Sequence, residues 1–262
     1  RNRDYTPTPN GPRSASSNLH GQGAAYQTYL KNEVLPFIDN RFRADPARRV
    51  LLGHSYGGLL GAQILFTDPS MFHSYILGSP SFWFDKRHIM TMEAAYARSH
   101  TDLPANVFMY VGDWEVPGPG PRNTSCANLV RDMQTMETTL KSHHYPNLRV
   151  QSLVLTDEDH LTIAPVGATR GLLAVLLAKE RVFTSLNPLL PIAWGGGASR
   201  LRAVTGAGLQ AKRPCERSDE SKQPSHHEPV ILALVARIHM PGPSAGRTAE
   251  HRAYGSLGQA QG

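Results

Sequence analysis

A serine lies at the centre of the segment Gly53-His54-Ser55-Tyr56-Gly57, which has the pattern G-x-S-x-G. This pattern is typical of a sharp turn between a strand and a helix, on which the serine side chain projects above a sheet as a nucleophile. The alternative is a glycine-rich turn with an incidental serine. An apolar segment precedes the pattern, and the small residues Gly58 and Gly61 follow it. This context favours Ser55 as a nucleophile.

A serine hydroxyl is a weak nucleophile near neutral pH, so it needs a base to accept its proton and a third group to orient that base. Among the twelve histidines, His160 follows a strand-like segment and precedes the last predicted helix. His143 and His144 end a predicted helix, where a positive charge suits the helix dipole. His54 is interpreted as a packing residue of the turn. We therefore predict that His160 is the base.

Two carboxylates compete for the orienting role. Asp113 and Glu115 both follow the apolar segment 106–111 and Gly112. A backbone carbonyl or a water could replace them, which would leave a working Ser–His dyad. The acidic residues 157–159 also lie beside His160, and their alternative interpretation is a solvated loop.

Catalysis at an ester carbonyl also needs hydrogen-bond donors for the developing oxyanion. The backbone N–H of Tyr56 is the first candidate, because it follows the nucleophile. A second donor normally comes from a loop after an early strand, upstream of the nucleophile. Before the strand that precedes the pattern, the sequence holds only one predicted helix and a polar loop, so we expect the early strands and that second donor to be missing.

These residues need elements that bring them together. Helical and strand-like patterns alternate from about residue 26 to residue 181, which predicts a mostly parallel sheet with helices on its faces. Strands are expected at 49–53, 74–77, 106–111 and 148–155, and helices at 26–38, 59–66, 129–140 and 168–179. From residue 187 the composition changes to Gly, Pro, Ser, Arg and His, with an apolar island at 230–238. We predict a folded domain at 1–186 and a disordered tail at 187–262.

Composition excludes several classes of protein. The net charge is +6, but nine basic and five acidic residues of 195–262 supply most of the surplus, so no nucleic-acid partner is predicted. No apolar run approaches the ~20 residues of a membrane span, and we expect no membrane partner. Cys126 and Cys215 lack the spacing of a zinc site, so the residues imply no metal and no cofactor. The polar start slightly favours a cytoplasmic protein, and the oligomeric state is not predicted.

The motifs as a set resemble the Putative esterase family of α/β-hydrolases, especially the members similar to enterochelin and salmochelin esterases, which hydrolyse siderophore esters. The resemblance extends from Arg3 to about Lys179. It rests on five segments in order: Arg3-Asp4-Tyr5-Thr6-Pro7, Leu35-Pro36-Phe37-Ile38 with Arg41-Phe42-Arg43, Gly53 to Leu59, Gly78-Ser79-Pro80-Ser81-Phe82-Trp83, and Glu158-Asp159-His160.

The resemblance implies an α/β-hydrolase fold and a serine esterase with a small-molecule ester, such as a siderophore ester, as substrate. It implies Ser55 as nucleophile, His160 as base, Tyr56 as oxyanion donor and Trp83 as a wall of the substrate cleft. Ordinary core packing is the alternative for Trp83. A carboxylate at the third position after a strand-ending glycine is common in this superfamily, which favours Glu115 over Asp113.

The chain also departs from the family pattern. Family members have about four strands before the segment that matches Arg3-Asp4, so we expect a fold truncated at its N-terminus. Simpler carboxylic esters are an alternative substrate class. An acyltransferase on the same scaffold and an inert remnant are alternatives to the esterase.

Overall fold

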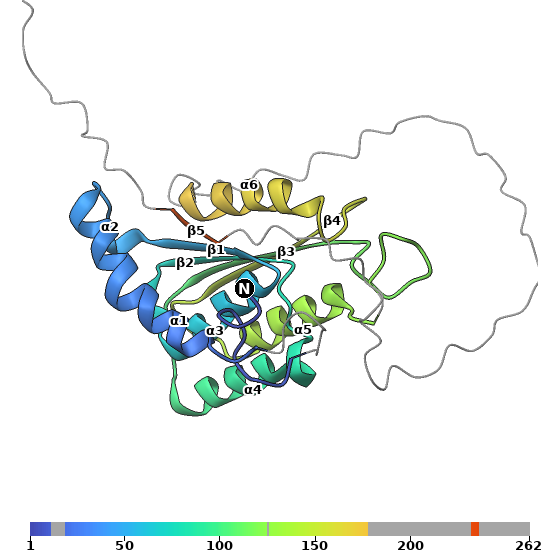
Figure 1. The fold of residues 1–262 in the computed structure, drawn as a ribbon, viewed down its shortest axis with the longest axis horizontal. Helices are drawn as coiled ribbons and strands as arrows, with labels where there is room; N and C mark the ends of the chain where they lie inside the picture. The colour runs from blue at the N-terminus through green and yellow to red at the C-terminus, as the bar shows by residue number, and fades with distance from the viewer. Residues whose placement is uncertain (12–18, 125, 178–231, 236–262) are drawn as a thin grey trace, which may run out of the picture.

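Four short apolar segments form a parallel sheet at the centre of the molecule. The computed structural model describes residues 1–11, 19–124, 126–177 and 232–235. Strands β1 (Val50–His54), β2 (Ser74–Gly78), β3 (Asn106–Gly112) and β4 (Arg149–Leu155) lie in the order β4-β3-β2-β1 (Figure 1). All three pairings are parallel. Each predicted strand is confirmed to within one residue at either end. Strands β1, β2 and β3 are buried almost throughout, as expected for strands covered on both faces, whereas β4 is only partly buried.

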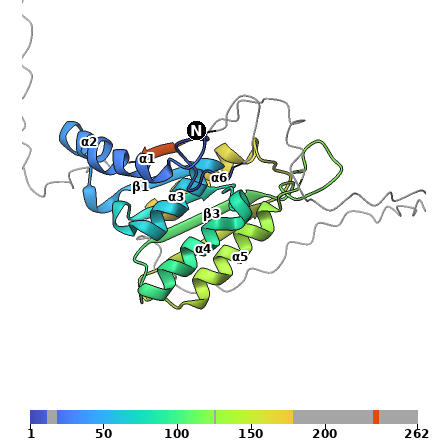
Figure 2. The ribbon, with the colours of Figure 1, turned by 60° about the horizontal axis from the view of Figure 1, so that its bottom comes forward.

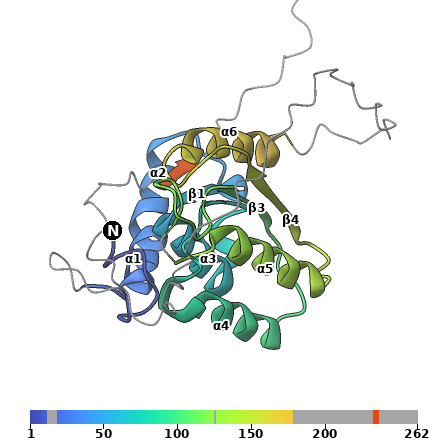
Figure 3. The same cartoon turned by 90° about the vertical axis from the view of Figure 1, so that its right-hand side faces the viewer.

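Helices cover both faces of this sheet (Figures 1 and 3). One face carries α3 (Tyr56–Thr67), α4 (Phe84–Ser99) and α5 (Leu129–Ser142), and Figure 2 views the molecule from this side. The other face carries α6 (Ile163–Leu176). The remaining helical segments are α1 (Gly23–Tyr29), the π-helical turn η1 (Leu30–Val34), α2 (Leu35–Arg41), η2 (Pro46–Arg48) and η3 (Pro69–Met71). Among these described helices, none has the length and apolar character to cross a bilayer.

The two faces of the sheet bury separate hydrophobic clusters. Alternate residues of β1 point to opposite faces. Leu51 joins the large cluster with α3, whereas Val50 and Leu52 join the smaller cluster beneath α6. Tyr110 of β3 belongs to the same smaller cluster.

The largest differences from the sequence expectation concern two helices. The last helix begins at Ile163, five residues before the predicted start at 168, because the Asp159 carboxylate accepts hydrogen bonds from the N–H groups of Leu161 and Thr162. Helix α4 was not predicted. Its first turn contains three successive residues with positive φ, Asp85 to Arg87, an arrangement that sequence patterns do not reveal.

A short strand from the C-terminal region lies along the edge of the sheet. Strand β5 (Leu232–Val235) pairs antiparallel with β1. These four residues of the predicted tail thus form a strand. Pairing satisfies main-chain groups that an edge strand would otherwise expose, and the apolar island at 230–238 supplies the segment. The rest of 187–262 lies outside the described residues, and the division at residue 186 stays a prediction.

Candidate active site

Ser55 occupies a strained turn between β1 and α3. Its φ of 59° and ψ of −122° are unfavourable for a residue with a side chain. The turn is held from both sides, since Ser55 N–H donates to the Gly78 carbonyl (2.9 Å) and Ser55 carbonyl accepts from Leu59 N–H (3.1 Å). The expected strand–turn–helix context of the G-x-S-x-G pattern is present.

Gly53 is needed because the backbone approaches it closely. A Cβ at this position would lie 2.2 Å from the Gly57 carbonyl oxygen, an atom of the turn itself. We predict that Gly53→Ala lowers the free energy of unfolding by about 1–3 kcal/mol, as overpacking does. Urea denaturation measures this effect. The control is Gly120→Ala, whose Cβ would meet side chains and no backbone, those of Asn123 at 3.0 Å and Trp114 at 3.9 Å. Equal stability of Gly53→Ala and the wild type would contradict the prediction.

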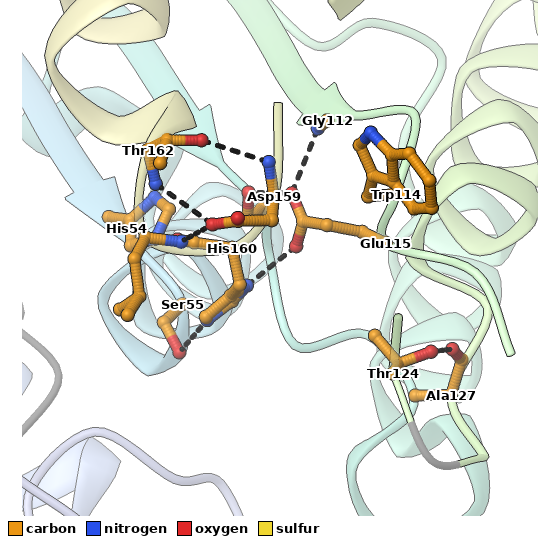
Figure 4. Close-up of polar contacts among 12 residues, drawn as sticks. His54, Ser55, Gly112, Trp114, Glu115, Thr124, Ala127, Asp159, His160 and Thr162 are labelled. Carbon is orange, nitrogen blue, oxygen red and sulfur yellow. Dashed lines mark hydrogen bonds and ion pairs between the residues drawn. The ribbon is translucent and has the colours of Figure 1, made fainter. Parts of the chain in front are cut away.

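His160 lies between the serine and a carboxylate (Figure 4). Its Nε2 is 3.0 Å from Ser55 Oγ, and its Nδ1 is 2.6 Å from Glu115 Oε2. The Glu115 carboxylate can only accept a hydrogen bond, so Nδ1 carries the ring proton and donates it, and Nε2 of the neutral ring is left to accept a hydrogen bond from the serine hydroxyl. The structure thus brings together Ser55, His160 and Glu115 from three loops at the carboxyl ends of β1, β4 and β3.

Glu115, and not Asp113, faces His160. The Glu115 side chain is fully buried, and its second oxygen, Oε1, accepts from Ser79 Oγ (2.6 Å) and from Gly112 N–H (2.8 Å). Asp113 Oδ1 has no hydrogen-bond partner among the described residues. The buried charge of Glu115 is therefore compensated by three hydrogen bonds, as a buried carboxylate requires.

The loop that carries His160 is clamped by an arginine from another loop. Arg122 Nε donates to Asp159 Oδ2 (2.7 Å), and Arg122 Nη1 donates to Asp157 Oδ1 (2.6 Å). The guanidinium also lies 5.3 Å from the centre of the Trp114 ring. Burial alone would raise the pKa of Asp159, but hydrogen bonds from Arg122 and two backbone N–H groups outweigh it and lower that pKa. Two of the three acidic residues at 157–159, Asp157 and Asp159, are thus ion-paired with Arg122, although the Asp157 side chain is exposed.

Arg122→Met should flatten the acid dependence of stability. Because the pKa of Asp159 is lowered in the folded state, its contribution to stability is present above the ordinary aspartate value of 3.8 and is lost as pH falls through the lower folded value. Without Arg122 the folded and unfolded pKa values converge. Urea denaturation between about pH 5 and pH 2 measures the slope. Arg98→Met is the control, since exposed Arg98 forms no ion pair in the described segments. An unchanged slope in Arg122→Met would refute the prediction.

The other two predicted site residues, Tyr56 and Trp83, lie close to each other. Tyr56 is the first residue of α3, so its N–H lies at a helix N-terminus, which favours negative charge. Trp83 precedes α4, is partly buried, and lies with its ring centre 6.1 Å from that of Tyr56. Arg1 lies 5.6 Å from the centre of the Tyr56 ring. The cleft-wall role of Trp83 stays a prediction.

Three supporting residues of the site were not predicted. Ser79 and the Gly112 N–H hold Glu115, and Arg122 holds the loop of His160. Ser79 directly follows β2, whose carboxyl end lies beside that of β3. This position in the sequence was a signal that could have identified Ser79 as a neighbour of Glu115. Arg122 lies far from His160 in sequence, and no local pattern points to it. No group of His, Cys, Asp and Glu in the described ranges is arranged to hold a metal ion.

The fold is a mostly parallel sheet between helical layers, with a serine, a glutamate and a histidine in contact on its carboxyl-edge loops in that chain order. This arrangement is typical of the α/β-hydrolase class. The chain belongs to the Putative esterase family, whose model matches residues 1–159. This is the same family that the sequence motifs resemble.

Two curated proteins are similar in sequence. The ferri-bacillibactin esterase BesA of Bacillus subtilis is 26% identical over 66% of this chain and 60% of its own length. The siderophore triacetylfusarinine C esterase of Aspergillus fumigatus is 29% identical over 66% of this chain and 63% of its own length. The chain thus spans less than two thirds of either relative.

A solved structure shares the fold. The crystal structure of an IroE-like serine hydrolase from Shewanella oneidensis matches with a TM-score of 0.56 and 24% identity, over 69% of this chain and 57% of the other.

Proposed function

We propose that this chain carries the active site of a serine esterase that hydrolyses carboxylic esters. The observation that supports it is the continuous series of contacts from Ser55 Oγ through His160 to Glu115, with distances of 3.0 Å and 2.6 Å. A series of this kind activates a hydroxyl that would otherwise be a weak nucleophile. The family membership agrees with this chemistry.

In the first half of the reaction, Ser55 Oγ attacks the ester carbonyl carbon while its proton moves to His160 Nε2. The negative oxygen of the tetrahedral intermediate is stabilised by the N–H of Tyr56 at the start of α3. Glu115 stabilises the imidazolium through the proton on Nδ1. The C–O bond of the leaving alcohol then breaks, the alcohol takes the proton from Nε2, and an acyl group remains on Ser55.

In the second half, His160 Nε2 removes a proton from water, whose oxygen attacks the acyl carbon. Collapse of this second intermediate returns the proton to Ser55 Oγ and releases the carboxylic acid. Atoms and charges balance with water as the only co-reactant. The steps use side chains, one backbone N–H and water, and none is routed through a cofactor.

The substrate class that the relatives support is a siderophore ester. The two curated proteins are named as esterases of ferri-bacillibactin and of triacetylfusarinine C. We extend this class to the present chain, with Trp83 beside Tyr56 as the aromatic surface for a bulky substrate. Simpler carboxylic esters are the alternative. A comparison of kcat/KM for a siderophore ester and for p-nitrophenyl acetate tests the assignment, and equal values would contradict it.

The activity itself is tested with p-nitrophenyl acetate and a fluorophosphonate probe. We expect release of p-nitrophenol, and intact-mass analysis should find one probe molecule per chain, attached to Ser55 by peptide mapping. Absence of both turnover and adduct would overturn the proposal and favour an inert member of the family. Product analysis with an alcohol present distinguishes hydrolysis from acyl transfer, since a transferase would form the new ester in preference to the acid.

A further inference from the structure

His54 is buried beside the candidate base, although it immediately precedes the nucleophile. It is the last residue of β1 and is 2% exposed. Side chains alternate along a strand, so His54 shares the α6 face with Val50 and Leu52, whose side chains lie in the cluster beneath α6. The loop that leads into α6 carries His160. The alternation of side chains along β1 therefore places His54 on the same side of the sheet as the loop that carries His160.

The two histidines are in direct contact (Figure 4). His54 Nε2 lies 2.9 Å from the backbone carbonyl oxygen of His160, and the ring centres are 4.9 Å apart. A carbonyl can only accept, so His54 Nε2 carries the proton and donates it. Two adjacent residues of the same turn thus contact different parts of His160. Ser55 contacts its ring, and His54 contacts its main chain.

The His54 ring is itself held in place by Tyr110. The two rings are stacked with an interplanar angle of 24° and centres 6.3 Å apart. Tyr110 is fully buried, and its side chain packs directly against the backbones of Gly78 and Gly167. A Cβ on either glycine would come within 2.2 Å of the Tyr110 side chain. Burial raises the pKa of the Tyr110 phenol, and the charge of Glu115 raises it further, so the ring stays neutral. The His54 ring, which carries the Nε2–H donor, therefore packs against a Tyr110 side chain that has little room to move.

We propose that His54 is a positioning residue for the ester hydrolysis described above, and that it acts by fixing the main chain of His160. This inference rests on the proposed function. During each turnover His160 Nε2 must accept a proton from Ser55 and pass it to the leaving alcohol. Both transfers need the imidazole to keep its place against Ser55 Oγ. A displacement of about 1 Å at a reacting group can lower the rate about 10²-fold.

The test compares two replacements of His54. His54→Phe keeps a ring against Tyr110 but has no N–H to donate. We expect it to lower kcat by about 10²-fold, with KM for p-nitrophenyl acetate nearly unchanged, because substrate binding does not involve His54. His54→Gln places an amide nitrogen near the position of Nε2 and should recover most of kcat. Rescue by the amide separates hydrogen bonding from ring packing.

The matched control is His143→Phe. His143 follows the last residue of α5 and contacts Glu93 through Nε2 at 2.7 Å. At the N-terminal end of this 14-residue helix, Leu129 N–H donates a hydrogen bond to the Glu115 carbonyl. His143 therefore lies about 21 Å along the helix from the site. We expect its kcat to equal that of the wild type. Melting temperatures of all variants, taken together with kcat per folded molecule, remove any contribution from unfolding.

A second measurement does not depend on turnover. The proton between His160 Nδ1 and Glu115 is expected to give a low-field ¹H resonance, because the contact is short at 2.6 Å. This resonance should broaden or shift in His54→Phe and return in His54→Gln. Wild-type kcat and an unchanged resonance in His54→Phe would overturn the positioning role. If the wild type neither turns over substrate nor reacts with the probe, the proposed function fails, and the resonance still decides whether His54 positions His160.

Discussion

Ser55→Ala is expected to lower kcat for ester hydrolysis by about 10³- to 10⁶-fold and to abolish labelling by a fluorophosphonate. The variant removes the oxygen that attacks the ester carbonyl, and that the probe labels, in the mechanism proposed above. His160 and Glu115 keep their own contact at 2.6 Å, so the rest of the site is preserved. Initial rates with p-nitrophenyl acetate and intact-mass analysis measure both effects.

The control for this variant is Ser70→Ala. Ser70 is exposed in η3 and donates to Asp68, so its loss should leave kcat unchanged. Folding of Ser55→Ala is checked by its melting temperature, which should stay close to that of the wild type because alanine meets the same strain at a φ of 59°. Ser55→Gly should relieve that strain and raise the free energy of unfolding by about 1 kcal/mol while remaining inactive. Residual wild-type turnover in Ser55→Ala would refute its role as nucleophile.

Glu115→Gln has the second largest expected effect, a decrease in kcat of about 10⁴-fold. The glutamine oxygen can keep the hydrogen bonds from Ser79 and from the Gly112 N–H. Its amide NH₂ then faces His160 Nδ1 and donates to it, which moves the ring proton to Nε2. A protonated Nε2 cannot accept the proton of Ser55, so the nucleophile is not activated.

Asp113→Asn is the matched variant, because it neutralises the competing carboxylate two residues away in the same turn. We expect its kcat to fall by no more than a few-fold. The reverse ranking of the two variants would assign the acid to Asp113. Nearly full activity of both would favour the Ser–His dyad.

The turn and the sheet were predictable because their signals are local. An apolar strand, a G-x-S-x-G segment and a helix with small residues specify the turn of Ser55 within about twenty residues, since steric limits on adjacent backbones require glycine there. Short buried runs between helices likewise specify a parallel sheet. His160 was predictable for a related reason, because its strand ends at the same edge of the sheet as β1.

The support of the site depends on contacts between segments that are distant in sequence. Glu115 and Asp113 both follow Gly112, and the choice between them depends on the loop of His160 and on Ser79, which approach from β4 and β2. The same is true of the His54 contact with the His160 carbonyl and of the Arg122 contact with Asp159. Strand β5 is a further case, because its pairing with β1 joins residues about 180 positions apart. Periodicity and short motifs report the conformation of neighbouring residues, whereas the direction of a side chain at the end of a strand is decided by the loops packed against it, and these meet only in the folded molecule.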